Sequence, residues 1–109
     1  MWACYFGEIT ESYLKDWSPH TVRPDEAEPD IHDVIGSEYA IGYRLDMRAA
    51  EKYFPDWIQV DWGGWAYKVN KEKILQYNEE AGPLYSIPEW VLDKMEPGIE
   101  YAVIDVELS

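Results

Sequence analysis

The amino-acid sequence predicts an α+β fold: a single domain with a mostly antiparallel sheet of about five strands and three to four short helices packed on it. Short segments with alternating apolar and polar residues predict the strands, because successive strand side chains point to opposite faces. Segments that begin at a capping residue and end at glycine or proline predict the helices. Six Trp and nine Tyr indicate a chain that folds.

The pattern predicts strands at residues 2–9, 38–45, 57–62, 65–69 and 99–108. The last of these is apolar on both faces over Tyr101-Ala102-Val103-Ile104, which is typical of a central strand that is covered on both sides. Gly63-Gly64 predicts a two-residue hairpin turn between the third and fourth strands. Residues that flank such a turn pair across the strands, so we expect Trp62 and Trp65 to lie side by side.

Thr10 is expected to cap a short helical turn through Trp17, and capping residues predict helices at residues 31–35, 47–54, 71–80 and 86–95. Asp46 and Asn70 are expected to cap the helices at residues 47–54 and 71–80, and Gly82 is expected to end the latter. Ser86 and Glu89 have the spacing of a capping box. Residues 1–109 are therefore interpreted as one compact domain, in which residues 18–38 form an acidic, proline-rich loop with a short helix.

Charge is the most unusual property of the sequence. The sequence has nine basic and 22 acidic residues, which gives a formal net charge of −13. The acids concentrate in residues 24–38, with six acids and no base, and in residues 74–109, with eight acids and one base. Such a chain repels phosphates and anionic lipids, so direct binding to nucleic acid or to a membrane surface is not expected. A high acidic charge also serves solubility, which is the plainer interpretation.

The sequence predicts no catalytic residues, no cofactor and no metal site. It has neither a nucleophile elbow nor a glycine-rich phosphate loop. Imidazole and carboxylate groups gather at His20, Asp30, His32 and Asp33, but their spacing matches no closed metal motif, and Asp30 is better explained as a helix cap. Paired carboxylates could serve glycoside hydrolysis, but among 22 acids some pair always has a plausible separation.

The cellular setting follows from two negative features of the sequence. No run approaches the roughly 20 apolar residues of a membrane span, and the first residues lack the basic start of a signal peptide. Cys4 is the only cysteine, so an internal disulfide is impossible, and we expect its thiol to be buried in a strand. These features favour a cytoplasmic protein.

Size and charge together favour a small, acidic, non-catalytic binding protein that blocks a partner with a basic surface, such as a nuclease, a toxin or a defence complex. Inhibitors that mimic nucleic acid, immunity proteins, antitoxins and phage anti-defence proteins of the anti-CRISPR type use this strategy. An accessory domain that binds a small ligand or forms a homodimer is the alternative, and a small carboxylate-based enzyme comes third. The residues expected to bind the partner are Asp25, Glu26, Glu28, Asp30, Asp33, Trp62 and Trp65.

Overall fold

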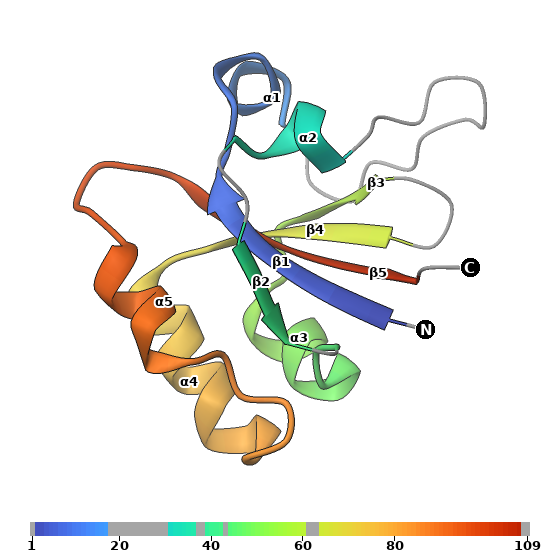
Figure 1. Cartoon of the computed structure of the whole chain (residues 1–109), viewed down its shortest axis with the longest axis vertical. Coiled ribbons are helices and arrows are strands. Elements are labelled where there is room, and N and C mark those ends of the chain that lie inside the picture. The colour runs from blue at the N-terminus through green and yellow to red at the C-terminus, as the bar shows by residue number, and fades with distance from the viewer. Residues whose placement is uncertain (1, 18–30, 37–38, 43, 61–63, 108–109) are drawn as a thin grey trace.

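A five-stranded antiparallel sheet with helices on both faces forms the protein (Figure 1). This computed structural model describes residues 2–17, 31–36, 39–42, 44–60 and 64–107. The strands are β1 (Trp2–Glu8), β2 (Tyr39–Gly42), β3 (Trp57–Val60), β4 (Gly64–Val69) and β5 (Tyr101–Glu107). Their order across the sheet is β2-β1-β5-β4-β3, so the predicted α+β class and the central position of the last strand are confirmed.

Among the described residues, four helices have six residues or more: α1 (Glu11–Asp16), α3 (Met47–Tyr53), α4 (Lys71–Ala81) and α5 (Glu89–Lys94). The fifth, α2 (Ile31–Val34), is a single turn. The expected caps of α3 and α4 are confirmed, because Asp46 accepts a hydrogen bond from the Ala49 amide and Asn70 accepts one from the Lys73 amide. Gly82 ends α4 at a φ of 76°, a value that favours glycine.

Each face of the sheet has its own hydrophobic core. Helices α3, α4 and α5 cover the face that carries Phe6, Tyr67 and Val103, and this surface is called the first face below. The opposite face carries Ile58, Ala66 and Ile104 and packs against residues of α1 and α2. Both faces of β5 are buried, which explains why its sequence is apolar on both sides.

Two capping predictions need correction. The Thr10 hydroxyl makes no cap on α1 and instead donates to the Asp33 carbonyl at 2.7 Å, which ties α1 to α2. The capping box of Ser86 and Glu89 is not formed, because α5 begins after Pro88, and the Ser86 hydroxyl donates back to the Gly82 carbonyl. In both places a tertiary contact or a local turn uses the hydroxyl that the sequence pattern assigned to a helix start.

The predicted two-residue hairpin turn is also wrong. Gly64 belongs to β4, where it pairs with Val60, so the connection spans residues 61–63, which lie outside the described residues. A β-carbon on Gly64 would lie 2.7 Å from the Val60 carbonyl oxygen and 3.1 Å from a methyl carbon of Val106. Close approach within the sheet, rather than a left-handed turn conformation, therefore explains this glycine.

The structure describes no helix that is both long enough and apolar enough to cross a membrane.

Candidate interaction surface

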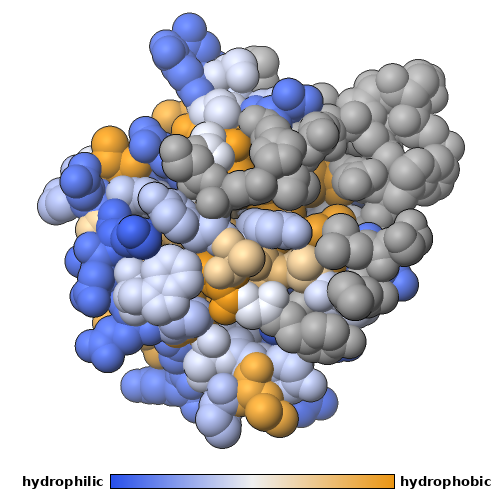
Figure 2. Space-filling view, viewed as in Figure 1, coloured by the Kyte–Doolittle hydropathy of each residue, from blue (hydrophilic) through white to orange (hydrophobic). Residues whose placement is uncertain are grey.

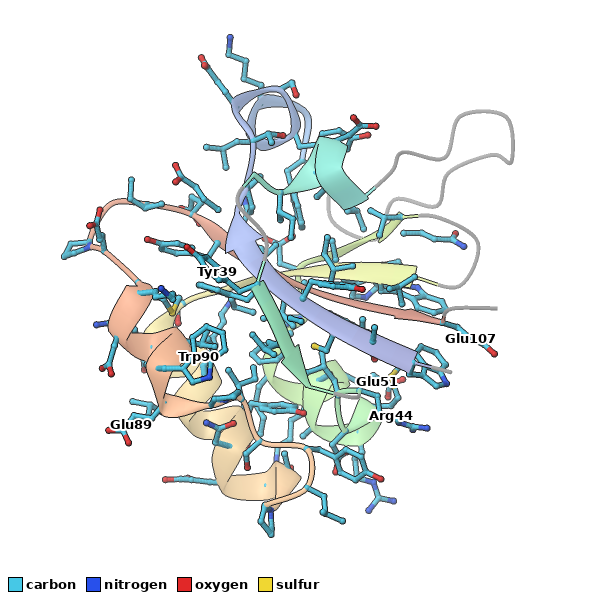
Figure 3. All side chains as sticks on the ribbon, in the orientation of Figure 1. Tyr39, Arg44, Glu51, Glu89, Trp90 and Glu107 are labelled. Atoms are coloured by element: carbon cyan, nitrogen blue, oxygen red, sulfur yellow. The ribbon has the colours of Figure 1, made fainter. Side chains whose placement is uncertain are left out.

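An exposed aromatic pair stands at one edge of the sheet. Tyr39 begins the edge strand β2, and Trp90 lies in α5; each has 40% of its surface exposed. Their ring centroids are 6.1 Å apart with an angle of 74° between the planes, an edge-to-face arrangement. Figure 3 shows the two side chains facing each other, with Glu89 on the outer side of α5. The pair is an apolar surface that no described residue covers completely.

A cation already lies on this pair. Lys94 is one helical turn after Trp90, so both side chains share a face of α5. The Lys94 ammonium is 4.5 Å from the centre of the Tyr39 ring and 6.0 Å from the centre of the Trp90 ring. Both distances suit a cation–π contact. The electron-rich faces of these rings are therefore accessible to a positive group.

An open hollow of about 420 Å³ adjoins the aromatic pair. Its acidic members are Glu8 at the end of β1, Asp93 in α5 and Glu96 just after α5, and all three residues are exposed. None of them forms an ion pair within the described part of the chain, where the ion pairs are Lys15–Glu11 and Lys52–Glu80. Tyr39, Trp90, Lys94, Glu8, Asp93 and Glu96 are called the acidic–aromatic surface below. Figure 2 shows that the side of the molecule where α4 and α5 lie is mostly hydrophilic.

Tyr101 holds the floor of the hollow in place. Its hydroxyl accepts a hydrogen bond from the Glu96 amide at 2.9 Å and donates one to the Lys94 carbonyl at 3.2 Å. Its ring stacks on Phe6 with centroids 5.2 Å apart. Because the end of α5 is fastened to the central strand in this way, the carboxylates and rings of the surface are held on rigid elements.

A second hollow of about 340 Å³ continues from the first, with Glu96 and Tyr101 in the lining of both. Apolar side chains of Val69, Met95 and Ile99 line part of it, together with the turn at Pro97 and Gly98. Gly98 has a φ of 82°, a value that favours glycine at this turn. The two hollows extend the surface around the end of the sheet where β5 begins.

The residues predicted to bind a partner are only partly described. Asp33 is exposed in α2, whereas Asp25, Glu26, Glu28, Asp30 and Trp62 lie outside the described residues. Trp65 lies opposite Gln59 of β3, so it has no direct cross-strand pair with another tryptophan, and its ring packs partly buried against the core of the first face. Trp90 lies beside β2, at the edge of the sheet opposite to β3.

The acids of the C-terminal third do not share one face. Glu89 and Glu107 lie on opposite sides of the molecule in Figure 3. Asp105 is only 1% exposed and therefore belongs to no surface. The acidic segment thus divides into a surface part around α5, a distant end at Glu107, and one buried carboxylate.

Asp105 is the most unusual polar group in the described core. It points from β5 into the first face between Cys4 of β1 and Trp65 of β4, and neither carboxylate oxygen makes a hydrogen bond of normal geometry, although the Leu45 amide lies close enough to favour the charged form. Loss of hydration raises the pKa of Asp105 to about 6, although the Leu45 amide and the Arg44 guanidinium act in the opposite direction. Burial, together with the Asp105 charge, also raises the pKa of the Cys4 thiol.

No group of three or more metal-binding side chains occurs within residues that the structure describes. His20 and Asp30 of the predicted cluster lie outside those residues.

The chain is an α+β protein with an acidic–aromatic surface at one edge of its sheet. Comparisons with models of protein families, with curated proteins and with solved structures found no match to it.

Proposed function

We propose that this chain is a non-catalytic binding protein that blocks a partner protein with a basic, nucleic-acid-handling surface. A net charge of −13 attracts such a partner and speeds the encounter. The working surface of such a partner binds the phosphates of nucleic acid. Carboxylates that a rigid scaffold presents can occupy the same positions. Inhibitors, immunity proteins, antitoxins and anti-CRISPR proteins are the classes that this proposal covers.

The observation that carries the proposal is how the described positive charges are used. Lys15 and Lys52 pair with Glu11 and Glu80. Arg44, Lys68 and Lys94 lie over aromatic rings of the same chain. These five bases are engaged within the molecule, whereas the three carboxylates of the acidic–aromatic surface face solvent without an ion pair among the described residues. Arg48, Lys71 and Lys73 have no such contact among the described residues, and Lys71 lines the adjoining hollow, so the uncompensated negative charge is local to Glu8, Asp93 and Glu96.

The test is a pull-down from the source cells with the purified protein, at low salt and again at about 0.5 M salt, where charge interactions are strongly screened. We expect a protein that is retained at low salt, released at high salt and displaced by added DNA or RNA. A gel shift with random DNA and RNA accompanies it and should show no complex with the protein alone. Failure to retain any protein that nucleic acid displaces would contradict the proposal.

A small-ligand function is the second candidate, and the hollow of about 340 Å³ favours it because Val69, Met95 and Ile99 give it apolar walls. A thermal-shift screen with metabolites tests it. A ligand that raises the melting temperature, and whose effect disappears in a Met95→Glu variant that is folded, would favour this candidate over the inhibitor.

A further inference from the structure

We infer that the Tyr39–Trp90 pair receives an arginine side chain from the partner, and that Lys94 occupies this position in the free protein. This inference rests on the proposed function, because it assumes a basic protein as the occupant. It assigns the contact that anchors the complex, whereas the charge of the chain accounts only for attraction.

Charge alone does not give a tight complex. Exposed ion pairs each contribute only about 0–1 kcal/mol and weaken with salt. Strong protein interfaces contain a few anchors, enriched in Trp, Tyr and Arg, that lose contact with water on binding. Tyr39 and Trp90 are 40% exposed and adjacent, so a partner could bury both rings at once.

The present position of Lys94 shows what kind of group the rings accept. Its ammonium lies 4.5 Å from the Tyr39 centroid, and it forms no hydrogen bond or ion pair with the described residues that would hold it there. A guanidinium is planar and less strongly hydrated than an ammonium, so it stacks on aromatic rings more favourably. The Lys94 side chain is exposed and flexible, which allows it to leave when an arginine arrives.

The surroundings of the pair fit a basic protein segment. Glu8, Asp93 and Glu96 outnumber Lys94, so the acidic–aromatic surface is negative even before the lysine moves. The hollow of about 420 Å³ beside the rings leaves room for the backbone that carries the arginine. A nucleic acid is a poor occupant because its phosphates would meet these carboxylates. A second copy of this chain is also a poor occupant, since it carries the same net charge of −13.

The test compares octa-arginine with octa-lysine, two peptides of equal formal charge, in titrations followed through the tryptophan indole NMR signals. Wild-type protein should bind octa-arginine about fivefold more tightly than octa-lysine, and the Trp90 indole signal should shift. Trp90→Ala and Tyr39→Ser should each abolish this preference. Lys94→Ala should strengthen the binding of octa-arginine, because a competing cation is gone.

Two controls separate the anchor from general charge. Glu96→Gln should weaken both peptides by the same factor, because a carboxylate does not distinguish the two cations at long range. Leu84→Ala removes a side chain that is 84% exposed and lies outside the acidic–aromatic surface, so it should change neither affinity. Circular dichroism shows whether each variant is folded. If Trp90→Ala does not fold, Tyr39→Ser still tests whether the aromatic pair causes the preference for octa-arginine.

Equal affinities of the wild-type protein for the two peptides, or a preference for octa-arginine that survives in both folded aromatic variants, would overturn the inference. The pull-down keeps this failure distinct from failure of the proposed function. If wild type and Trp90→Ala retain the same salt-sensitive partner equally well, the inhibitor proposal stands and the arginine anchor is rejected. If neither protein retains a partner that nucleic acid displaces, the proposed function fails as well.

Discussion

Tyr101 and Asp105 lie on the same face of β5, and both are buried, but their side-chain oxygens differ in hydrogen bonding. The Tyr101 hydroxyl has a donor and an acceptor at the end of α5. The Asp105 carboxylate has no hydrogen-bond partner in the described structure. Removing a polar group should therefore have opposite effects at the two ends of one strand: a loss of stability at Tyr101 and a gain at Asp105.

The cause lies in what packs above each residue. The last residue of α5, Lys94, presents its carbonyl to Tyr101, and Glu96, just after the helix, presents its amide. Above Asp105, the Leu45 amide and the Arg44 guanidinium lower the pKa of the carboxyl less than burial raises it. The Arg44 guanidinium lies instead over the rings of Trp2 and Tyr85, at 5.7 and 5.9 Å from their centroids. The positive charge that favours the ionised Asp105 thus lies on aromatic rings and is not bonded to the carboxylate.

Val103→Asp should have the largest effect, because it places a second carboxylate midway between the two residues. Val103 is fully buried between Phe6 of β1 and Tyr67 of β4. An unpaired buried charge costs several kcal/mol, against a total stability of about 5–15 kcal/mol. We expect a chain that is unfolded by circular dichroism at pH 7. A folded variant with the melting temperature of the wild type would show that this face tolerates carboxylates generally.

Asp105→Asn should stabilise the protein at pH 7. The folded pKa of Asp105, about 6, lies above the ordinary aspartate value of 3.8, so the native state binds the extra proton and loses stability as the pH rises from about 4 to 6. The full shift corresponds to roughly 3 kcal/mol, and a buried amide without partners cancels part of it, which leaves a gain of about 1–2 kcal/mol.

Urea unfolding at pH 7 and at pH 4 measures this gain. The gain should disappear at pH 4, where the carboxyl is protonated in the native protein, and the variant should then be the less stable protein by roughly 1 kcal/mol. A gain in stability that is equal at pH 7 and at pH 4 would show that the shape of the side chain, rather than its charge, is responsible. Lower stability of the variant at pH 7 would mean that the carboxylate has a favourable partner after all.

Tyr101→Phe should act in the opposite direction by a similar or smaller amount. It removes one hydroxyl and leaves the Glu96 amide and the Lys94 carbonyl without their partner, which costs about 1–2 kcal/mol. Urea unfolding at pH 7 gives the value, and it should not change at pH 4. Greater stability of this variant would remove the proposed contrast between the two ends of β5.

Glu80→Gln should have the smallest effect. Glu80 accepts hydrogen bonds from Lys52 and from the Tyr53 hydroxyl, and these contacts lower the pKa of Glu80. The Lys52 and Glu80 side chains are 58% and 37% exposed, so solvent and salt screen the pair. The melting temperature should match that of the wild type within error in 0.15 M salt. A clear loss of stability would show that an exposed ion pair matters more here than the buried carboxylate.

Local sequence patterns predicted the elements of this fold because their causes are local. Asp46 and Asn70 cap helices through the amide three residues later, a contact that the sequence spacing defines. Alternation placed residues 57 and 59 on one face and Ile58 and Val60 on the other, as the pairing of β3 with β4 confirms. Gly64 was misplaced because a glycine required by packing looks the same in a sequence as one required by a turn.

The candidate surface could not be predicted in the same way. Trp90 and Lys94 have the spacing of neighbours on a helix, but only the tertiary fold brings Tyr39 next to them. Asp105 left a signal in the sequence, since a lone acid stands between Ile104 and Val106 in an apolar strand. That signal indicates a buried charge. Whether the carboxylate finds a hydrogen-bond partner depends on the position of Arg44 and Leu45, just before α3, and the sequence does not give that position.

Cys4 offers a chemical reporter of how this sheet opens. It is the only thiol in the chain, it is 2% exposed, and it lies opposite Asp105 in the pairing of β1 with β5. An alkylating reagent needs an accessible thiolate, and burial raises the pKa of this thiol, so labelling has to wait until β1 separates from the core. The labelling rate under native conditions, divided by the rate for the unfolded chain and followed by mass spectrometry, would therefore give the free energy of that opening without any denaturant.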